Sequence, residues 1–101
     1  MAILQVSVVP VGTSTTSLSS WVAECLRLLA AYPNLKHELT PMGTVIEGSL
    51  EDALNAARDM HEVLFKIGAQ RVLTTISIDD RRDRRLTLRS KVDSVVKKLK
   101  E

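Results

Sequence analysis

The sequence predicts one α+β domain, in which helices cover one face of a four-stranded antiparallel sheet. Stretches with the two-residue period of strands alternate with apolar stripes that have the period of a helix. Their order is strand, helix, strand, strand, helix, strand, followed by one further helix. A length of 101 residues allows one hydrophobic core and is too short for two, so we expect residues 1–101 to form a single domain.

The first strand is predicted over residues 3–9, which are mostly apolar or β-branched, and Pro10 ends the run. Residues 13–20 include seven hydroxyl side chains, which favour a loop that leads to a helix N-cap. A helix is therefore expected to begin near Ser17 or Ser20. Its apolar stripe has spacings of three and four and ends before Pro33; it consists of Leu18, Val22, Cys25, Leu29 and Tyr32.

A hairpin is predicted next, because residues 37–40 and 44–47 are extended runs separated only by Pro41-Met42-Gly43. A second helix should start after Ser49, which is a suitable N-cap with acidic residues following it. Gly68 is well placed to end that helix. Its apolar stripe consists of Leu50, Ala53, Ala57, Met60, Leu64 and Ile67.

The last strand is predicted over residues 71–78, and the charged run 79–85 follows it. A third helix then has a narrow apolar stripe, which we expect to pack on another surface; it consists of Leu88, Val92, Val95 and Leu99. Right-handed crossovers in both halves give a ferredoxin-like βαββαβ sandwich with an additional C-terminal helix.

Alternation assigns side chains to the two faces of this sheet. Leu4, Val6 and Val8 should meet the helices, whereas Ile3, Gln5, Ser7 and Val9 should lie on the open face. On the third strand, Glu47 shares a face with Val45, and Thr44 shares the opposite face with Ile46. We place Glu47 on the open face, because a carboxylate beneath the helices would be costly to desolvate.

The open face is predicted to be either hydrated or covered by a second copy of the chain. Ile3, Val9 and Val45 give it an apolar character that is unfavourable in water. A homo-oligomer, either a dimer or a tetramer through the sheet faces, would bury these residues. A small planar ligand near Ser7 and Glu47 could then be enclosed at the interface.

Several function classes are disfavoured by composition. Fourteen basic and 12 acidic residues give a charge of +2, and Trp21, Tyr32 and Phe65 fall on predicted helices, so we expect no nucleic acid partner. No apolar run approaches the ~20 residues of a membrane span and no signal peptide is recognisable, so we expect a cytoplasmic protein with no membrane partner.

We also expect no catalytic residue, no metal and no cofactor. Cys25 is the single cysteine and lies within an apolar stripe, where it should act as a small hydrophobic residue. His61 has no second histidine or nucleophile nearby in sequence, which favours a structural role. The hydroxyl-rich loop lacks the glycine spacing and the lysine of a phosphate-binding loop. The four arginines and three aspartates of residues 79–85 should pair with one another.

The chain resembles the thiamine-binding (hydroxymethylpyrimidine-binding, YkoF-like) small protein family. The resemblance covers almost the whole chain through the segments VPVGT (9–13), SLS (17–19), LTPMGTVIEG (39–48), HE (61–62) and TTISIDDRRD (74–83). It implies a ferredoxin-like subunit that assembles into dimers or tetramers through its sheets. It also implies a site for thiamine or its pyrimidine moiety, and no catalysis.

The resemblance suggests which residues would hold an aminopyrimidine. Glu47 is predicted to bind the ring edge, with Ser7 and Thr44 supplying hydroxyls. Met42 would form a polarizable wall, and Thr13 or Ser17 would approach from the loop. The alternative is a structural or regulatory protein-association domain that binds no small molecule.

Overall fold

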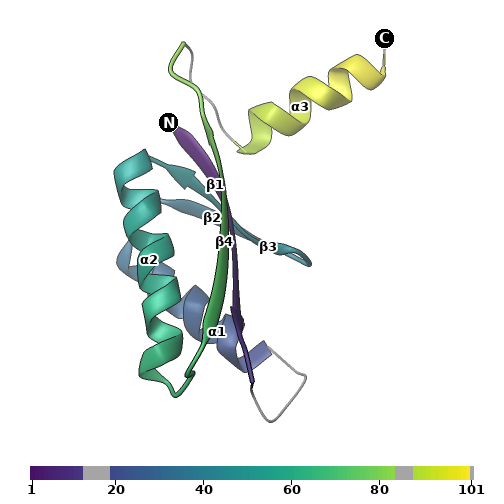
Figure 1. Ribbon diagram of the computed structural model, residues 1–101. Coiled ribbons are helices and arrows are strands. Elements are labelled where there is room, and N and C mark those ends of the chain that lie inside the picture. The colour runs from purple at the N-terminus through teal and green to yellow at the C-terminus, as the bar shows by residue number, and fades with distance from the viewer. Residues whose placement is uncertain (13–18, 84–87, 101) are drawn as a thin grey trace.

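The computed structural model describes residues 1–12, 19–83 and 88–100, and its elements follow the predicted order. The elements are β1 (Ala2–Pro10), α1 (Ser19–Leu28), a 3₁₀ turn η1 (Leu29–Ala31), β2 (Lys36–Thr40), β3 (Gly43–Gly48), α2 (Leu50–Lys66), β4 (Val72–Asp80) and α3 (Leu88–Leu99). The sheet has the order β2-β3-β1-β4 with every pair antiparallel. This is the predicted ferredoxin-like arrangement (Figure 1).

Several strand ends differ from the prediction by one residue, and two boundaries differ in a more informative way. The first helix ends as a 3₁₀ turn, in which the Tyr32 amide donates to the Leu29 carbonyl at 3.0 Å, because Pro33 prevents a further α-helical turn. Strand β4 continues through Asp79 and Asp80, which sequence analysis assigned to the charged run. These aspartates stay in the strand because Ile3 and Ala2 of β1 are opposite them in the ladder.

Helix α2 has the capping that its sequence predicts. The Ser49 hydroxyl accepts a hydrogen bond from the Asp52 amide at 3.2 Å, and Glu51 and Asp52 lie in the first turn, where the helix dipole favours negative charge. At the other end, Gly68 has a positive φ of 119° and its amide donates to Phe65. The prediction of both ends of this helix is confirmed.

The core lies between the sheet and the layer formed by α1 and α2. Leu4 and Val6 of β1 and Ile46 of β3 point into it, as alternation predicts. Three alanines of α2 are completely buried, and their small size allows the helix to lie close to the sheet; they are Ala53, Ala56 and Ala57. Each central strand therefore has one face in the core.

Helix α3 lies on the side of the sheet opposite α1 and α2 and extends away from the body of the molecule (Figure 1). Val92, Val95 and Leu99 are 54%, 57% and 80% exposed. The prediction that this stripe packs on another surface is therefore not met within one chain. The physical reason is geometric: only the first turns of α3 lie near the sheet, and the rest of the helix leaves it.

Candidate functional site

The β2–β3 hairpin is the most sharply constrained part of the sheet. Pro41 and Met42 form its two-residue turn, since Thr40 and Gly43 are paired in the ladder. The Thr40 hydroxyl donates to the Gly43 carbonyl at 2.8 Å and accepts from the Met42 amide at 3.3 Å. Gly43 has φ +147°, and a Cβ at this position would lie 2.8 Å from the carbonyl oxygen of Val6. The hairpin tip is thereby held closely against β1.

A hollow of about 300 Å³, which we call the hairpin hollow, lies where this tip meets β1 and α1. Its walls are mainly apolar, and its lining residues are Val6, Ser7, Val8, Val9, Val22, Cys25, Leu39, Thr40, Pro41, Met42, Gly43, Thr44 and Met60. The Thr44 side chain is buried, with 3% of the residue exposed, whereas Met42 is 77% exposed. The hairpin hollow therefore combines a dry wall with a few hydroxyl groups.

Cys25 lies in the wall of the hairpin hollow, where its thiol donates to the Met60 carbonyl at 3.6 Å. Burial raises the pKa of the Cys25 thiol. The neutral thiol is therefore the favoured form, as expected of a packing residue.

We expect the Cys25 thiol to react at least roughly tenfold more slowly with a thiol-specific reagent in the folded chain than in the urea-unfolded chain, because burial limits both thiolate and access. The raised pKa also has a stability consequence. The preference of the folded chain for the neutral thiol adds to the free energy of unfolding. This stabilisation is complete below the ordinary thiol pKa and is lost as pH rises through the higher pKa of the folded state. Colorimetric titration measures the rate unambiguously because the chain has one cysteine. Equal rates in the two states would contradict the burial.

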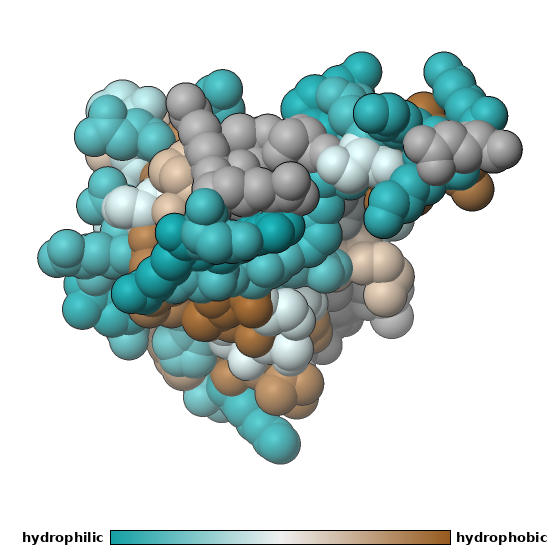
Figure 2. Space-filling view, turned by 90° about the horizontal axis from the view of Figure 1, so that it is seen from above, coloured by the Kyte–Doolittle hydropathy of each residue, from teal (hydrophilic) through white to brown (hydrophobic). Residues whose placement is uncertain are grey.

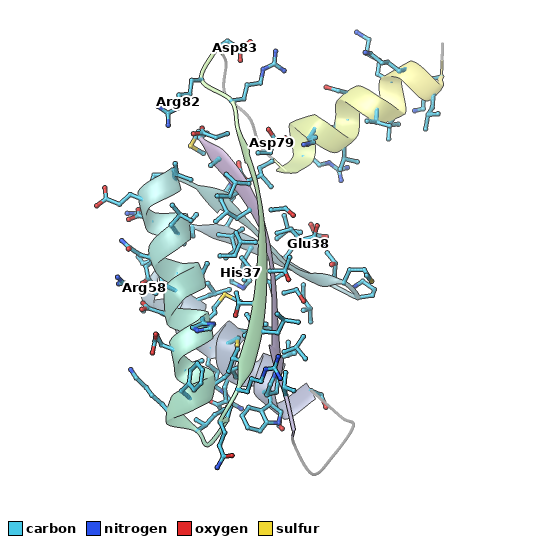
Figure 3. The ribbon with its side chains drawn as sticks, in the orientation of Figure 1. His37, Glu38, Arg58, Asp79, Arg82 and Asp83 are labelled. Carbon is cyan, nitrogen blue, oxygen red and sulfur yellow. The ribbon has the colours of Figure 1, made fainter. Side chains whose placement is uncertain are left out.

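A second hollow of about 360 Å³ lies on the other face of the sheet, and we call it the open-face hollow. It is lined by Ile3, Gln5, Glu38, Val45, Ser77, Ile78, Asp79, Lys91 and Val92. Glu38 is on the side of the sheet away from α2, and Asp79 is beside the start of α3 (Figure 3). The Asp79 carboxylate accepts a hydrogen bond from the Lys91 ammonium, which links α3 to β4.

A smaller hollow connects these two regions. It measures about 250 Å³ and is lined by Gln5, Ser7, Met42, Thr75 and Ser77. It shares Ser7 and Met42 with the hairpin hollow, and it shares Gln5 and Ser77 with the open-face hollow. The accessible polar groups of the open face thus follow a line from the hairpin tip to α3.

The structure brings three of the sequence-predicted ligand residues together. Ser7, Met42 and Thr44 all line the hairpin hollow. Thr13 and Ser17 lie outside the described residues. The contact of loop residues with a ligand therefore stays a prediction.

Glu47 is separated from this group. It is opposite Ile3 and Lys36 in the ladder, on the open face as alternation predicts, and only 4% of it is exposed. It lies roughly 10 Å along β3 from Thr44, whose side chain points to the other face. Glu47 lines none of the three hollows. Glu47 and Thr44 therefore lie too far apart, on opposite faces of the sheet, to bind one ring edge together.

Sequence reasoning placed Gln5 on the open face but missed three other polar residues that line the open-face hollow. Ser77 is opposite Gln5 on β4, Glu38 comes from β2, and Asp79 comes from the extended end of β4. Alternation could have placed these three on the open face as well. Their grouping needed the register of three strand pairs, which no local pattern specifies.

His61 has structural contacts, as expected. Its Nδ1 is 2.6 Å from the Thr74 hydroxyl, and its ring meets the edge of Phe65 at a centroid distance of 5.3 Å. The contact with Thr74 joins α2 to β4, the contact with Phe65 lies within α2, and both are outside the three hollows. In the charged run, Arg81 pairs with Asp83 and Arg82 pairs with Asp80, so the predicted internal pairing is confirmed for these residues.

A family model described as thiamine-binding protein matches residues 4–96. The chain belongs to this family. The relatives of this chain include UPF0045 protein YqgV of Bacillus subtilis, which is 46% identical to it over 98% of each chain. A UPF0045 protein of Methanothermobacter thermautotrophicus is 41% identical over 98% of this chain and 100% of its own length.

Solved structures similar to this thiamine-binding family member support the same fold. Protein MJ1052 of Methanocaldococcus jannaschii has a TM-score of 0.85 and 31% identity, covering 93% of this chain and 94% of its own. A Thermotoga maritima protein named for thiamine biosynthesis or salvage has a TM-score of 0.77. That protein is 20% identical, with 93% and 97% of the two chains covered, and its likeness concerns the fold alone. In the part of the chain that the structure describes, no helix is long and apolar enough to span a membrane.

Proposed function

We propose that this protein binds thiamine or its hydroxymethylpyrimidine moiety without catalysing a reaction, and that the pyrimidine ring occupies the hairpin hollow. The single observation that carries this proposal is the convergence of Ser7, Met42 and Thr44 on one mainly apolar hollow in a chain of the thiamine-binding family. The volume of about 300 Å³ is near the lower end of ligand pockets and suits a single substituted ring.

The chemistry of the hollow is compatible with an aminopyrimidine. The Thr44 hydroxyl can donate and accept a hydrogen bond, which matches a ring nitrogen or an exocyclic amine. The Ser7 side chain points to the opposite face of the sheet, so its hydroxyl would meet a ligand only from the rim of the hollow. The Met42 thioether, at the exposed rim, offers a polarizable contact to the ring. The Thr40 hydroxyl already holds the hairpin together, which leaves Thr44 as the principal buried hydroxyl.

Binding is favoured over catalysis by the composition of this hollow. No histidine or carboxylate is among the described residues that line it. Its one thiol has a raised pKa, so Cys25 is a poor nucleophile. An enzyme would need an acid, a base and a nucleophile that converge on its substrate. The described residues that line the hairpin hollow do not supply such a set.

The same proposal includes a cytoplasmic homo-oligomer that covers the open face. Val45 is half-buried on that face and lines its hollow, where a second copy would remove apolar surface from water. Ile3 lines the same hollow but is only 9% exposed within one chain, so the expectation that it adds exposed apolar surface to this face is not met. A competing candidate is a protein-association domain with no small-molecule ligand, which the exposed apolar residues of α3 favour.

Thr44→Val should weaken thiamine binding about tenfold, because it replaces a buried hydroxyl by a methyl group of similar size and removes one hydrogen bond. Calorimetric titration with thiamine and with hydroxymethylpyrimidine measures the effect. Thr74→Val is the matched control, since it loses a hydroxyl outside the hollows and should bind as the wild type does. Unchanged thiamine affinity in the Thr44→Val variant would show that the pyrimidine ring does not bind in this hollow.

Glu47→Ala distinguishes the hairpin hollow from a site at the far end of β3. With the ring in the hairpin hollow, affinity should be unchanged, since Glu47 is roughly 10 Å away along the strand. A loss of affinity with retained folding would instead support the sequence prediction that Glu47 binds the ring edge. If neither pyrimidine raises the melting temperature of the wild type at saturating concentration, the association domain becomes the better description.

A further inference from the structure

Met42 is the most accessible of the three methionines in the chain. It is 77% exposed, whereas Met1 is 42% exposed and Met60 is 2% exposed. Among the large apolar side chains that the structure describes, only Leu99 is more exposed, on the projecting helix α3, whose apolar side chains lie among charged ones (Figure 2). Leucine has no reactive atom, whereas peroxides oxidise the thioether of methionine to a sulfoxide. Met42 is therefore the methionine most open to oxidation.

The position of Met42 places this reactive group at the proposed ligand site. Met42 lines both the hairpin hollow and the smaller hollow of about 250 Å³, which we call the connecting hollow. The hairpin hollow has an apolar wall that includes Val22 and Met60. The other residues of the connecting hollow are all polar, and they are Gln5, Ser7, Thr75 and Ser77. The Met42 side chain therefore lies at the boundary between an apolar and a polar environment.

The backbone at Met42 is held in place, so only its side chain is free to choose between these environments. The Met42 amide donates to the Thr40 hydroxyl at 3.3 Å, and that hydroxyl donates to the Gly43 carbonyl at 2.8 Å. A methionine side chain has three rotatable bonds. It can therefore turn from one hollow to the other while the hairpin stays against β1.

The connecting hollow offers more hydrogen-bond donors to a sulfoxide than the hairpin hollow does. Its amide and hydroxyl side chains make no hydrogen bond with other described residues, so their donors are available. In the hairpin hollow, the Thr40 hydroxyl and the Cys25 thiol already donate to backbone carbonyls. A thioether is a weak acceptor, whereas a sulfoxide is polar and needs a donor when it leaves water. Oxidation therefore favours the connecting hollow.

We infer that Met42 is an oxidation-sensitive cover of the hairpin hollow, which contacts the pyrimidine ring as a thioether and turns into the connecting hollow once hydrogen peroxide has converted it to a sulfoxide. In this reaction one peroxide oxygen is transferred to the sulfur as the O–O bond breaks. Its proton passes to the other oxygen, which leaves as water, so sulfur loses the two electrons that peroxide gains. The inference rests on the proposed binding of thiamine and adds a means of regulating it.

Oxidised wild-type protein should bind thiamine about fivefold more weakly than untreated protein, because the ring loses its contact with the sulfur atom. Peptide mass spectrometry confirms that Met42 carries the added oxygen, and calorimetric titration measures the affinity. Dithiothreitol is added after the peroxide, because it reverses oxidation of the Cys25 thiol to a sulfenic acid or a disulfide but leaves a methionine sulfoxide in place. Recovery of affinity with dithiothreitol alone would assign the effect to Cys25 and overturn the inference.

Met42→Leu is the matched control, since it keeps Met1, Met60 and Cys25 but has no thioether at the hairpin tip. Whatever its own affinity, this variant should bind thiamine equally well before and after peroxide treatment. A loss of affinity on oxidation of the control would place the sensitive group elsewhere and would contradict the role of Met42.

Two further measurements test the contact without relying on oxidative damage. Met42→Gln, whose polar amide resembles a sulfoxide in length and hydrogen bonding, should bind thiamine about as weakly as the oxidised wild type. Saturating thiamine should slow the oxidation of Met42 by peroxide, because the bound ring would cover the thioether. An unchanged oxidation rate in the presence of bound thiamine would overturn the inference.

The outcomes distinguish this inference from the proposed function. If the untreated wild type binds neither thiamine nor hydroxymethylpyrimidine, both fail. If it binds thiamine equally well before and after oxidation of Met42, only the inference fails. The melting temperature without ligand should stay nearly constant on oxidation, because Met42 is mostly exposed. A loss of affinity that is accompanied by unfolding would indicate general damage and would also overturn the inference.

Discussion

Ile46→Ala is expected to destabilise the protein by about 2–5 kcal/mol, which is the usual cost of truncating a fully buried isoleucine. Ile46 is 0% exposed and is opposite Leu4 in the ladder, beneath the helical layer. Removing its three outer carbons leaves a cavity between rigid neighbours that cannot close around it. For a domain of this size the change corresponds to a fall in melting temperature of about 10 °C or more.

The neighbouring position provides the control for this prediction. Val45→Ala changes a half-buried side chain on the open face of the same strand, and it should cost about 1 kcal/mol or less. Ile78→Ala removes the same atoms as Ile46→Ala at a position that is 50% exposed, and it should also be mild. Urea unfolding at one protein concentration gives all three values. Similar costs at positions 45 and 46 would contradict the assignment of the two faces.

Gly43→Ala is expected to destabilise the protein by roughly 2–4 kcal/mol and to abolish thiamine binding. Two effects combine at this residue. A side chain disfavours a φ of +147°, and the new Cβ would lie 2.8 Å from the Val6 carbonyl oxygen, a backbone atom that cannot move by itself. The hairpin would have to separate from β1, which would open the hairpin hollow. Thermal unfolding with and without thiamine measures both consequences.

Gly68→Ala separates strain from crowding. Gly68 also has a positive φ, +119°, but nothing lies within 4 Å of the position that a Cβ would occupy. Its substitution should therefore cost only about 1–2 kcal/mol of backbone strain and should leave thiamine binding intact. Equal costs at the two glycines would show that close contact with β1 is unimportant, and retained binding in Gly43→Ala would contradict the hairpin site.

Local patterns predicted much of the fold because each depends on near neighbours in the chain. Ser49 and Gly68 specify the ends of α2, and Pro41-Met42 between two extended runs specifies the hairpin. The alternation of Ile46 and Glu47 was sufficient to assign both to their correct faces. The site was harder to predict, because Ser7 and Thr44 are on different strands and their common hollow is formed at the end of the hairpin.

The sequence by itself determined the order of the elements, the buried face of each central strand and membership of a family through its motifs. Those properties follow from period, capping and turn chemistry, which act over a few residues. Only the tertiary structure decided that Thr44 joins Ser7 and Met42 while Glu47 lies apart, that β4 extends through Asp80, and that α3 projects with its apolar stripe exposed. The physical reason is that strand register and helix placement depend on contacts between residues distant in the chain.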